Sequence, residues 1–228
     1  MRSLSAGVLR DQATFWSAPF LAHGRKETLA AIPVVAGLAA LVASDRRLWD
    51  GISARSTASS VHDWRRVSDL GNTGFTMATP LATWSAGVLL HRPELQTSGG
   101  LMIEAVTSAS LETTVLKVLT GRARPLEPDA GRFHGLDGPQ DARFRRDLSF
   151  PSGNAAGAFA LATVISGRTR HAWVRWSSFA VASAIGLSRI GGEEHFPGDV
   201  VAGAALGFVT GKIVLHRHPR SEPGAASP

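Results

Sequence analysis

The sequence lacks cysteine altogether. Disulfide bonds and thiolate metal sites both require cysteine, so neither contributes to the stability or the chemistry of this chain. At 228 residues the chain is nevertheless long enough to bury a substantial core. We expect one domain with short tails.

A continuous basic patch is also missing, although the formal net charge is +6. The lysines and arginines are spread between apolar runs, and several belong to the motifs described below. A membrane surface and phosphate ligands therefore explain the positive charge better than nucleic acid does. We expect no nucleic-acid partner.

The first 26 residues show neither the pattern of a cleavable signal peptide nor that of a spanning helix. Arg10, Asp11 and Gln12 interrupt the apolar character, and no apolar stretch precedes a cleavage site of small residues. The aromatic segment from Ala13 to Leu21 favours a place along a membrane surface or, equally, a plain packing role. Residues 1–26 are therefore predicted to form an amphipathic or interfacial segment.

Long apolar runs are scarce, but six shorter ones recur, at residues 29–44, 75–90, 101–119, 154–167, 172–187 and 200–215. The mean hydropathy is only +0.05, and most runs are short against the roughly 20 residues of a spanning helix. Together they still predict an all-α bundle of six transmembrane helices over residues 27–216, followed by a disordered tail at 217–228.

Features within and between the runs support a bundle. Gly203, Gly207 and Gly211 repeat every four positions and predict close helix packing. Glu104 and Glu112 lie inside the third run, so we expect them to face the bundle interior and find partners there. Between the runs, residues 49–72 predict an irregular loop with a helical piece near 61–70. Residues 126–149 predict a loop over the site described next.

The segment from Ser188 to Asp199 has the pattern of a phosphoryl-transfer site at the start of a helix. Pro197 suits a first helical turn, so His195 precedes the helix and Asp199 lies within its first turn. A carboxylate four residues after an imidazole reaches back to one ring nitrogen and leaves the other free as a nucleophile or base. Arg189 adds a fork-shaped cation suited to phosphate oxygens. An isolated pair of this kind more often only caps a helix, but two further segments favour the functional interpretation.

The first of these segments contributes two more cations. Lys117 and Arg124 are two helical turns apart, so on a continuous helix both project from one face. Pro125 disfavours helix beyond Arg124. We therefore expect both cations at the end of this helix, pointing in the same direction. Arg122 lies off that face, and we expect it to contact solvent or the loop rather than phosphate.

The second segment, Phe150 to Asn154, precedes the apolar run that begins at Ala155. Ser152 is a good N-cap candidate, and Gly153 lets a backbone approach an anion closely. The free N–H groups and the positive dipole end of the helix would complete an oxyanion cradle.

Together, the three segments resemble the type 2 phosphatidic acid phosphatase family, whose superfamily also contains vanadium haloperoxidases. The family pattern is Lys-x6-Arg-Pro, then Pro-Ser-Gly-His, then Ser-Arg-x5-His-x3-Asp. The chain keeps every spacing of the first and third motifs, and the resemblance covers roughly residues 100–215. It implies a six-helix transmembrane bundle of the phosphatidic acid phosphatase/haloperoxidase type.

One position departs from the family pattern, because Asn154 stands where the family has histidine. In the family this histidine is the general acid that protonates the leaving group, and an amide supplies no proton. Asn154 therefore indicates either an impaired enzyme, natural or engineered, or a site whose leaving group needs little help. A diphosphate fits the second case, because its leaving group is a phosphate monoester. His134, a spare imidazole close in sequence to the site, is a weaker candidate for the missing acid.

The resemblance also implies a mechanism. His195 attacks phosphorus in line and forms a phosphohistidine that water hydrolyses, while Asp199 steadies the imidazolium. The phosphoryl oxygens are held by Lys117, Arg124, Ser152, Gly153 and Arg189. We expect no metal or other cofactor, because these cations do what magnesium does elsewhere and the adjacent Glu193 and Glu194 point apart.

The expected substrate is a lipid phosphate or a polyprenyl diphosphate, and membrane lipids are the expected surroundings. With a cytoplasmic amino terminus, six alternating spans place Arg25, Lys26, Arg92 and residues 168–175 inside. The three motifs then lie on the opposite, extracytoplasmic face, as in an integral protein of a bacterial inner membrane.

Three alternatives stay open. The first is a non-catalytic phospholipid-binding or transport-type protein of the same fold, which a natural Asn154 would favour. The second is a vanadate-dependent haloperoxidase, which uses the same anion cradle but is disfavoured by the short chain. The third, a soluble periplasmic acid phosphatase, is disfavoured because residues 1–26 show no signal-peptide pattern.

Overall fold

The computed structural model describes residues 4–17, 25–70, 73–137 and 148–219. Within these ranges the chain is helical apart from loops and one isolated antiparallel β-bridge, which confirms the predicted all-α class. The helices are α1 (Leu4–Ser17), α2 (Arg25–Ser53), α3 (Ala58–Leu70), α4 (Thr73–Leu89), α5 (Pro93–Thr120), the 3-10 helix η2 (Gly135–Asp137), α7 (Gly153–Arg168), α8 (Ala172–Gly191) and α9 (Pro197–Arg217).

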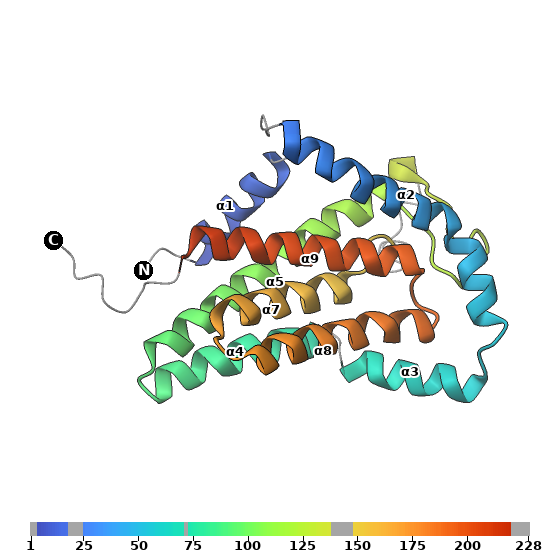
Figure 1. Ribbon diagram of the computed structural model, residues 1–228. Helices are drawn as coiled ribbons and strands as arrows, with labels where there is room; N and C mark the ends of the chain where they lie inside the picture. The colour runs from blue at the N-terminus through green and yellow to red at the C-terminus, as the bar shows by residue number, and fades with distance from the viewer. Residues whose placement is uncertain (1–3, 18–24, 71–72, 138–147, 220–228) are drawn as a thin grey trace.

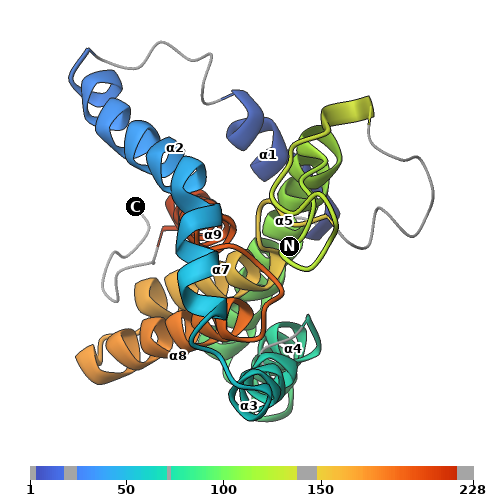
Figure 2. The same ribbon diagram turned by 90° about the vertical axis from the view of Figure 1, so that its right-hand side faces the viewer.

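The bundle is built around α7, which packs against α5, α8 and α9 and, less extensively, α4. These five helices lie side by side in Figure 1. Helix α1 packs against α5 and α9, α2 packs against α9, and α3 packs against α8. Seen from the end of the bundle, α2 projects away from it (Figure 2).

Each of the six predicted apolar runs falls on a helix, but the count of six spans is not confirmed. Among the described helices, α9 is the one that is long and apolar enough to cross a membrane by length and composition. Helices α4 and α7 have 17 and 16 residues. Helix α5 is longer but includes Glu104, Glu112 and Lys117, which lower its hydropathy.

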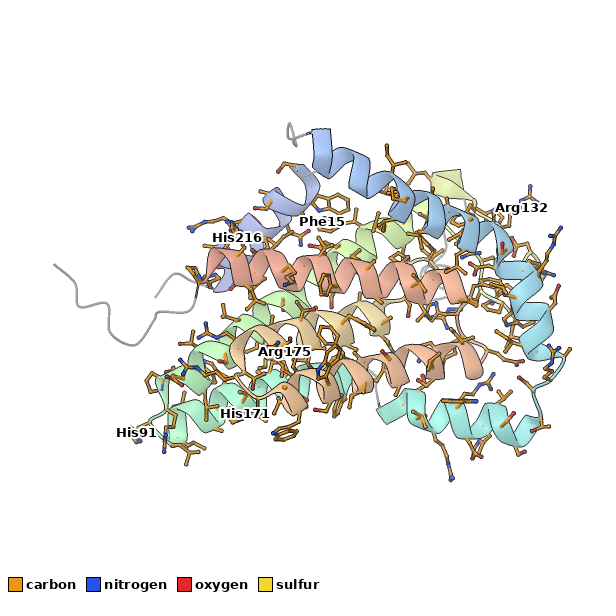
Figure 3. All side chains as sticks on the ribbon, in the orientation of Figure 1. Phe15, His91, Arg132, His171, Arg175 and His216 are labelled. Atoms are coloured by element: carbon orange, nitrogen blue, oxygen red, sulfur yellow. The ribbon has the colours of Figure 1, made fainter. Side chains whose placement is uncertain are left out.

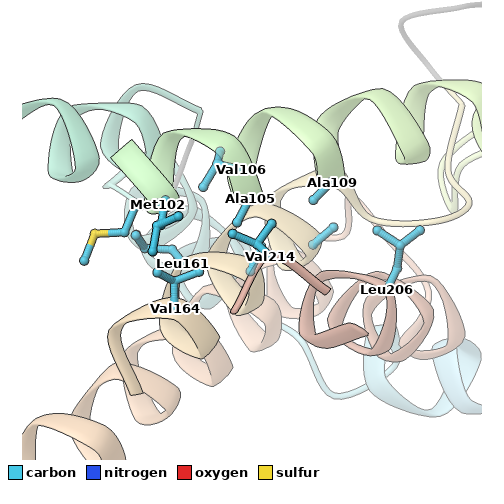
Figure 4. Packing of buried hydrophobic residues seen from close by; sticks show 11 residues of the cluster. Met102, Ala105, Val106, Ala109, Leu161, Val164, Leu206 and Val214 are labelled. Carbon is cyan, nitrogen blue, oxygen red and sulfur yellow. The ribbon is translucent and has the colours of Figure 1, made fainter. Parts of the chain in front are cut away.

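The core lies where α5, α7 and α9 meet, and Figure 4 shows the side chains that fill it. Helices α7 and α9 approach unusually closely, because a Cβ atom on Gly203 would lie 2.3 Å from the Ser152 carbonyl oxygen and one on Gly207 2.0 Å from that of Ala156. Only glycine fits at such distances, which confirms the predicted close packing. The contact also sets the amino-terminal ends of α7 and α9 side by side.

Helix α1 packs on the bundle through a polar contact. Asp11 is fully buried, and its Oδ1 lies 2.7 Å from Arg217 Nη1. Gln12 Nε2 donates to Glu112 Oε1 at 3.2 Å, and Thr210 donates to the other oxygen of Glu112. Glu112 is therefore buried and hydrogen-bonded, as predicted. Glu104 is buried as well, but its Oε1 makes no hydrogen bond among the described residues and lies 3.6 Å from His218 Nε2. The remainder of the predicted segment, residues 1–3 and 18–24, lies outside the described residues.

Residues 49–72 and the carboxyl-terminal tail were both predicted to lie outside the long helices. The helical piece predicted near residues 61–70 is confirmed as α3, but the irregular loop around it is shorter than the predicted 49–72, because α2 continues to Ser53 and α3 already begins at Ala58. Helix α9 ends at Arg217, close to the predicted start of the tail, and most of that tail, residues 220–228, lies outside the described residues. The domain boundaries at 26 and 216 stay a prediction.

Candidate active site

His195 and Asp199 lie at the start of α9 in the arrangement that Pro197 predicts. Asp199 Oδ2 lies 3.5 Å from His195 Nδ1 and accepts a hydrogen bond from the Phe196 N–H at 2.9 Å. Ser149, which the sequence analysis missed, donates to the same oxygen. The carboxylate thus caps the helix and orients the imidazole at once, and both side chains are buried.

Arg122 is buried between two carboxylates. Its Nη1 donates to Asp199 Oδ1 at 2.6 Å and to Asp45 Oδ2 at 2.8 Å. The guanidinium carbon also lies 4.8 Å and 4.6 Å from the ring centroids of Phe133 and Phe196. The predicted contact with the loop is confirmed, because Arg122 Nε donates to the Gly131 carbonyl oxygen at 3.4 Å, whereas a contact with solvent is wrong, because the side chain is only 2% exposed.

Asp45 reaches this site from α2, far away in the sequence. Its Oδ1 accepts a hydrogen bond from the Gly198 N–H at 2.7 Å. A Cβ atom at Gly198 would lie 2.4 Å from Asp45 Oδ2, so glycine makes room for the carboxylate. The sequence analysis assigned no role to Asp45, which follows directly after the first apolar run. A row of alternating charges therefore lies behind the imidazole and runs from Asp199 through Arg122 to Asp45.

The surroundings of His195 keep its imidazole neutral. Burial is the main cause that lowers the pKa of His195 to about 4. The positive charges of Lys117 and Arg124 lower this pKa further, and Asp199 acts in the opposite direction. The imidazole is consequently uncharged near pH 7, and because Nδ1 faces Asp199, Nε2 is the nitrogen available for attack.

Lys117 and Arg124 reach the site by different routes. Helix α5 ends at Thr120, because Gly121 takes the left-handed conformation, with φ of 55°, and terminates it. Arg124 therefore lies in the following loop, and the prediction that both cations share one helix face is wrong. Lys117 Nζ donates to the carbonyl oxygen of Leu148, and Arg124 is an electrostatic neighbour of Lys117.

Arg189, at the end of α8, donates to Ser68 of α3 and to Glu194. Glu194 Oε2 also lies 3.9 Å from Arg124 Nη1, and its Oε1 accepts from Ser68 Oγ at 3.1 Å. A carboxylate of the chain itself is therefore placed between two of the predicted phosphate-binding arginines. The neighbouring Glu193 points elsewhere, toward Ser53 of α2.

Ser152, Gly153 and Asn154 form the beginning of α7. Ser152 occupies the predicted N-cap position, but its buried hydroxyl makes no capping bond and has no hydrogen-bond partner among the described residues. The Ser152 N–H donates to the carbonyl oxygen of Asp199 at 2.9 Å, which ties α7 to α9 here. Buried hydroxyls normally have partners, so this one is suited to a bound ligand. Gly153 and Asn154 are half-buried in the first turn.

The structure thus brings all three predicted segments to one end of the bundle. Lys117 and Arg124 are electrostatic neighbours of His195, and the His195 N–H donates to the Arg189 carbonyl oxygen at 3.2 Å. His134 pairs with Asp129 in the preceding loop. Within residues 4–17, 25–70, 73–137 and 148–219, no three histidine, aspartate or glutamate side chains gather as a metal site requires.

A family model described as the PAP2 superfamily matches residues 99–223, more than half of the chain. The chain belongs to the PAP2 superfamily. The matched range contains all three motif segments, from Lys117 to Asp199.

Individual PAP2 relatives differ in how much of the chain they match. The Lipid A 1-phosphatase of Porphyromonas gingivalis is 40% identical over 67 residues, which is 28% of this chain and 15% of that protein's length. The crystal structure of Aquifex aeolicus LpxE covers 75% of this chain and 93% of its own, with 25% identity and a TM-score of 0.56. The transmembrane PAP2 type phosphatidylglycerolphosphate phosphatase of Bacillus subtilis covers 96% and 97%, with 19% identity and a TM-score of 0.60, and shows a shared fold.

Proposed function

We propose that this protein is a membrane phosphatase that hydrolyses a lipid phosphate or a polyprenyl diphosphate through a phosphohistidine on His195. The observation that carries the proposal is the buried imidazole of His195, with Nδ1 facing Asp199 and the positive charges of Lys117 and Arg124 close enough to lower its pKa. The names of the relatives agree, since both curated and solved PAP2 neighbours act on lipid phosphates.

The chemical steps follow from this arrangement. Nε2 of His195 forms a bond to phosphorus as the bond from phosphorus to the leaving oxygen breaks, and the electron pair departs with that oxygen. Asp199, itself held by Arg122, stabilises the imidazolium that forms. Water then attacks phosphorus, the P–N bond breaks, and inorganic phosphate and neutral imidazole result. The protein's own cations supply the charge stabilisation, so the proposed steps need no metal.

Substrate binding requires a rearrangement of Glu194. The phosphoryl oxygens are proposed to bind Lys117, Arg124 and Arg189 together with the Ser152 hydroxyl and the Gly153 N–H. Glu194 is bonded to two of these arginines, and an incoming dianion competes with it for the same donors. We infer that the substrate phosphate displaces the Glu194 carboxylate.

A groove beside the site supports a lipid substrate. A mainly apolar cavity of about 240 Å³ lies between α4, α7 and α8. Its lining includes Ile185, one helical turn before Arg189, and Ala158, one turn after Asn154. An acyl or prenyl chain that enters this groove would keep its phosphate at the cations. We further propose that the site opens at the extracytoplasmic face of a bacterial inner membrane.

Asn154 limits which leaving groups the site can release. An asparagine hydrogen-bonds phosphate but donates no proton, so the leaving oxygen must take its proton from solvent. A diphosphate suits such a site, because its leaving group is a weak base. Replacing Asn154 by histidine restores the general acid that the family resemblance implies.

The deciding experiment measures phosphate release from lipid monophosphates and polyprenyl diphosphates by the unaltered chain and by Asn154→His. General acids contribute about 10²-fold to 10⁴-fold, so we expect the variant to gain at least about tenfold on the monoester and less on the diphosphate. A double variant with His195→Ala is the control and must release nothing. If Asn154→His gains on no substrate, the acid lies elsewhere or the protein binds lipid phosphate without hydrolysing it.

A further inference from the structure

A large basic hollow lies at the end of the bundle opposite His195. It is formed where α4 and α7 end, where α5 begins and where α9 ends, and its volume is about 1340 Å³. The candidate active site lies at the other ends of α5, α7 and α9. Figure 3 shows this separation, with His91 and His216 at one end and Arg132 at the other.

The charge of the hollow is strongly unbalanced. Four arginines line it, Arg92, Arg168, Arg170 and Arg217, against one acid, Glu94. Two of the four also make structural contacts, since Arg217 pairs with the buried Asp11 and Arg168 Nε donates to Ser98 Oγ at 3.5 Å. Arg92 and Arg170 are exposed. Arginine's planar fork is matched to phosphate oxygens, so the hollow is suited to a phosphate-bearing ligand.

The surroundings of the hollow indicate where that phosphate comes from. Leu89 and Leu90, between α4 and α5, are 77% and 64% exposed. Trp173 and Trp176, at the start of α8, are 72% and 70% exposed. Exposed tryptophans and leucines beside arginines at helix ends are typical of the headgroup level of a bilayer. Leu90 lines the hollow itself, and Trp173 follows its lining residue Arg170 by three positions. A free phosphate ion would gain nothing from these apolar side chains, whereas a lipid would.

We propose that this hollow binds the phosphate headgroup of an anionic phospholipid in the leaflet opposite the active site. The lipid phosphate contacts Arg92 and Arg170, and its chains lie against the leucine and tryptophan rim. Arg168 and Arg217 add positive charge to the hollow. Arg168 also joins α7 to α5, and Arg217 joins α9 to α1. This site lies too far from His195 to take part in phosphoryl transfer, and it depends on the membrane setting of the proposed function but not on hydrolysis.

The test is a lipid titration of the full chain in detergent, followed by native mass spectrometry, which yields a dissociation constant without any turnover. The lipids are phosphatidylglycerol and phosphatidylcholine of the same chain length, and inorganic phosphate is a third arm. Arg170→Gln and Arg175→Gln form a matched pair, because both arginines are exposed at the same end but only Arg170 lines the hollow. The double variant Arg92→Gln/Arg170→Gln measures the full effect.

We expect phosphatidylglycerol to bind at least about tenfold more tightly than phosphatidylcholine, because arginine–phosphate hydrogen bonds are charge-assisted and the headgroups differ in net charge. Arg170→Gln should weaken phosphatidylglycerol binding about fivefold and the double variant more, while Arg175→Gln leaves it unchanged. Helical content and unfolding temperature without lipid should match the unaltered chain for all variants.

Three results would overturn the proposal. Equal weakening by Arg170→Gln and Arg175→Gln would reduce the effect to general surface charge. Equal affinity for the two lipids would show that the hollow does not select an anionic headgroup. Displacement of phosphatidylglycerol by an equal concentration of inorganic phosphate would make the hollow a free-anion site. Because none of these measurements uses hydrolysis, loss of the proposed phosphatase activity would not be mistaken for failure of this site.

Discussion

The α9 side and the α8 side of the candidate site hold their charges in different ways. On the α9 side, Arg122 is 2% exposed and lies between Asp45 and Asp199, both fully buried. On the α8 side, the Arg124 and Glu194 side chains are 27% and 24% exposed, and water reaches them. The first set has its partners within the protein, whereas the second holds an internal carboxylate where a phosphate is proposed to bind.

This difference separates a permanent part of the site from an exchangeable one. Breaking a buried ion pair leaves an uncompensated charge and costs about 3–5 kcal/mol, whereas partly exposed pairs contribute about 0–1 kcal/mol because water screens them. The α9 side therefore keeps the imidazole oriented before substrate arrives. On the α8 side, Glu194 pairs with Arg124 and with Arg189, whose side chain is only 10% exposed, so Glu194 can leave when an incoming phosphate replaces the charge that it provides.

The largest effect is expected from Arg122→Gln, which removes the buried ion pairs on the α9 side. Asp45 and Asp199 would then face each other without their shared cation, so His195 would lose its orientation. We expect phosphate release to fall about 10³-fold and the unfolding temperature to drop. Arg132→Gln, an exposed arginine in the same loop, is the matched control. Nearly unaltered activity in Arg122→Gln would contradict the permanent role of this side.

The next effect concerns the pH at which activity is lost. His195 acts as a nucleophile only when neutral, and its pKa is lowered from the ordinary 6.5 to about 4. The rate constant kcat/KM should therefore stay level as pH falls through 6.5 and decline only near pH 4, so activity at pH 5.5 is about tenfold above that of an unshifted histidine. The measurement is a pH profile of kcat/KM on a polyprenyl diphosphate or a lipid phosphate monoester, with the rates corrected for ionisation of the substrate. A decline centred near pH 6.5 would show a solvated imidazole instead.

The smallest effect is expected from a substitution of Glu194 on the α8 side. Glu194→Gln keeps the size of the side chain but removes the charge that competes with phosphate. We expect KM, and the inhibition constant of inorganic phosphate, to fall about threefold to tenfold with little change in kcat. Glu193→Gln, next in sequence but directed at Ser53, should change neither constant. If Glu194→Gln instead weakened phosphate binding, Glu194 would be a support for the arginines and not a competitor.

The parts of the site that depend on local chemistry were predictable from the sequence. Pro197 identified the helix start, and the spacing of His195 and Asp199 then determined their contact. The glycine repeat predicted the close approach of α9, although not that α7 is its partner. Gly121 was a readable helix-stop signal, and its neglect led to the wrong placement of Arg124 on α5.

The remaining parts arise from contacts that no local pattern encodes. Asp45 meets Gly198 across more than half of the chain, so an isolated aspartate gave no indication of its role. Arg122 is buried by Asp45 and Asp199, which come from α2 and α9. Glu194 acquires its place only once Arg124 and Arg189 are brought together from two different segments.

The most direct test of the account is a search for the phosphohistidine. The unaltered chain and His195→Ala would be mixed with substrate labelled in the transferable phosphate, quenched in alkali, where phosphohistidine survives, and digested for mass spectrometry. The account predicts label on the peptide that contains His195 and none in the variant. Labelled phosphate release without any labelled peptide, or label on Ser152, would contradict it.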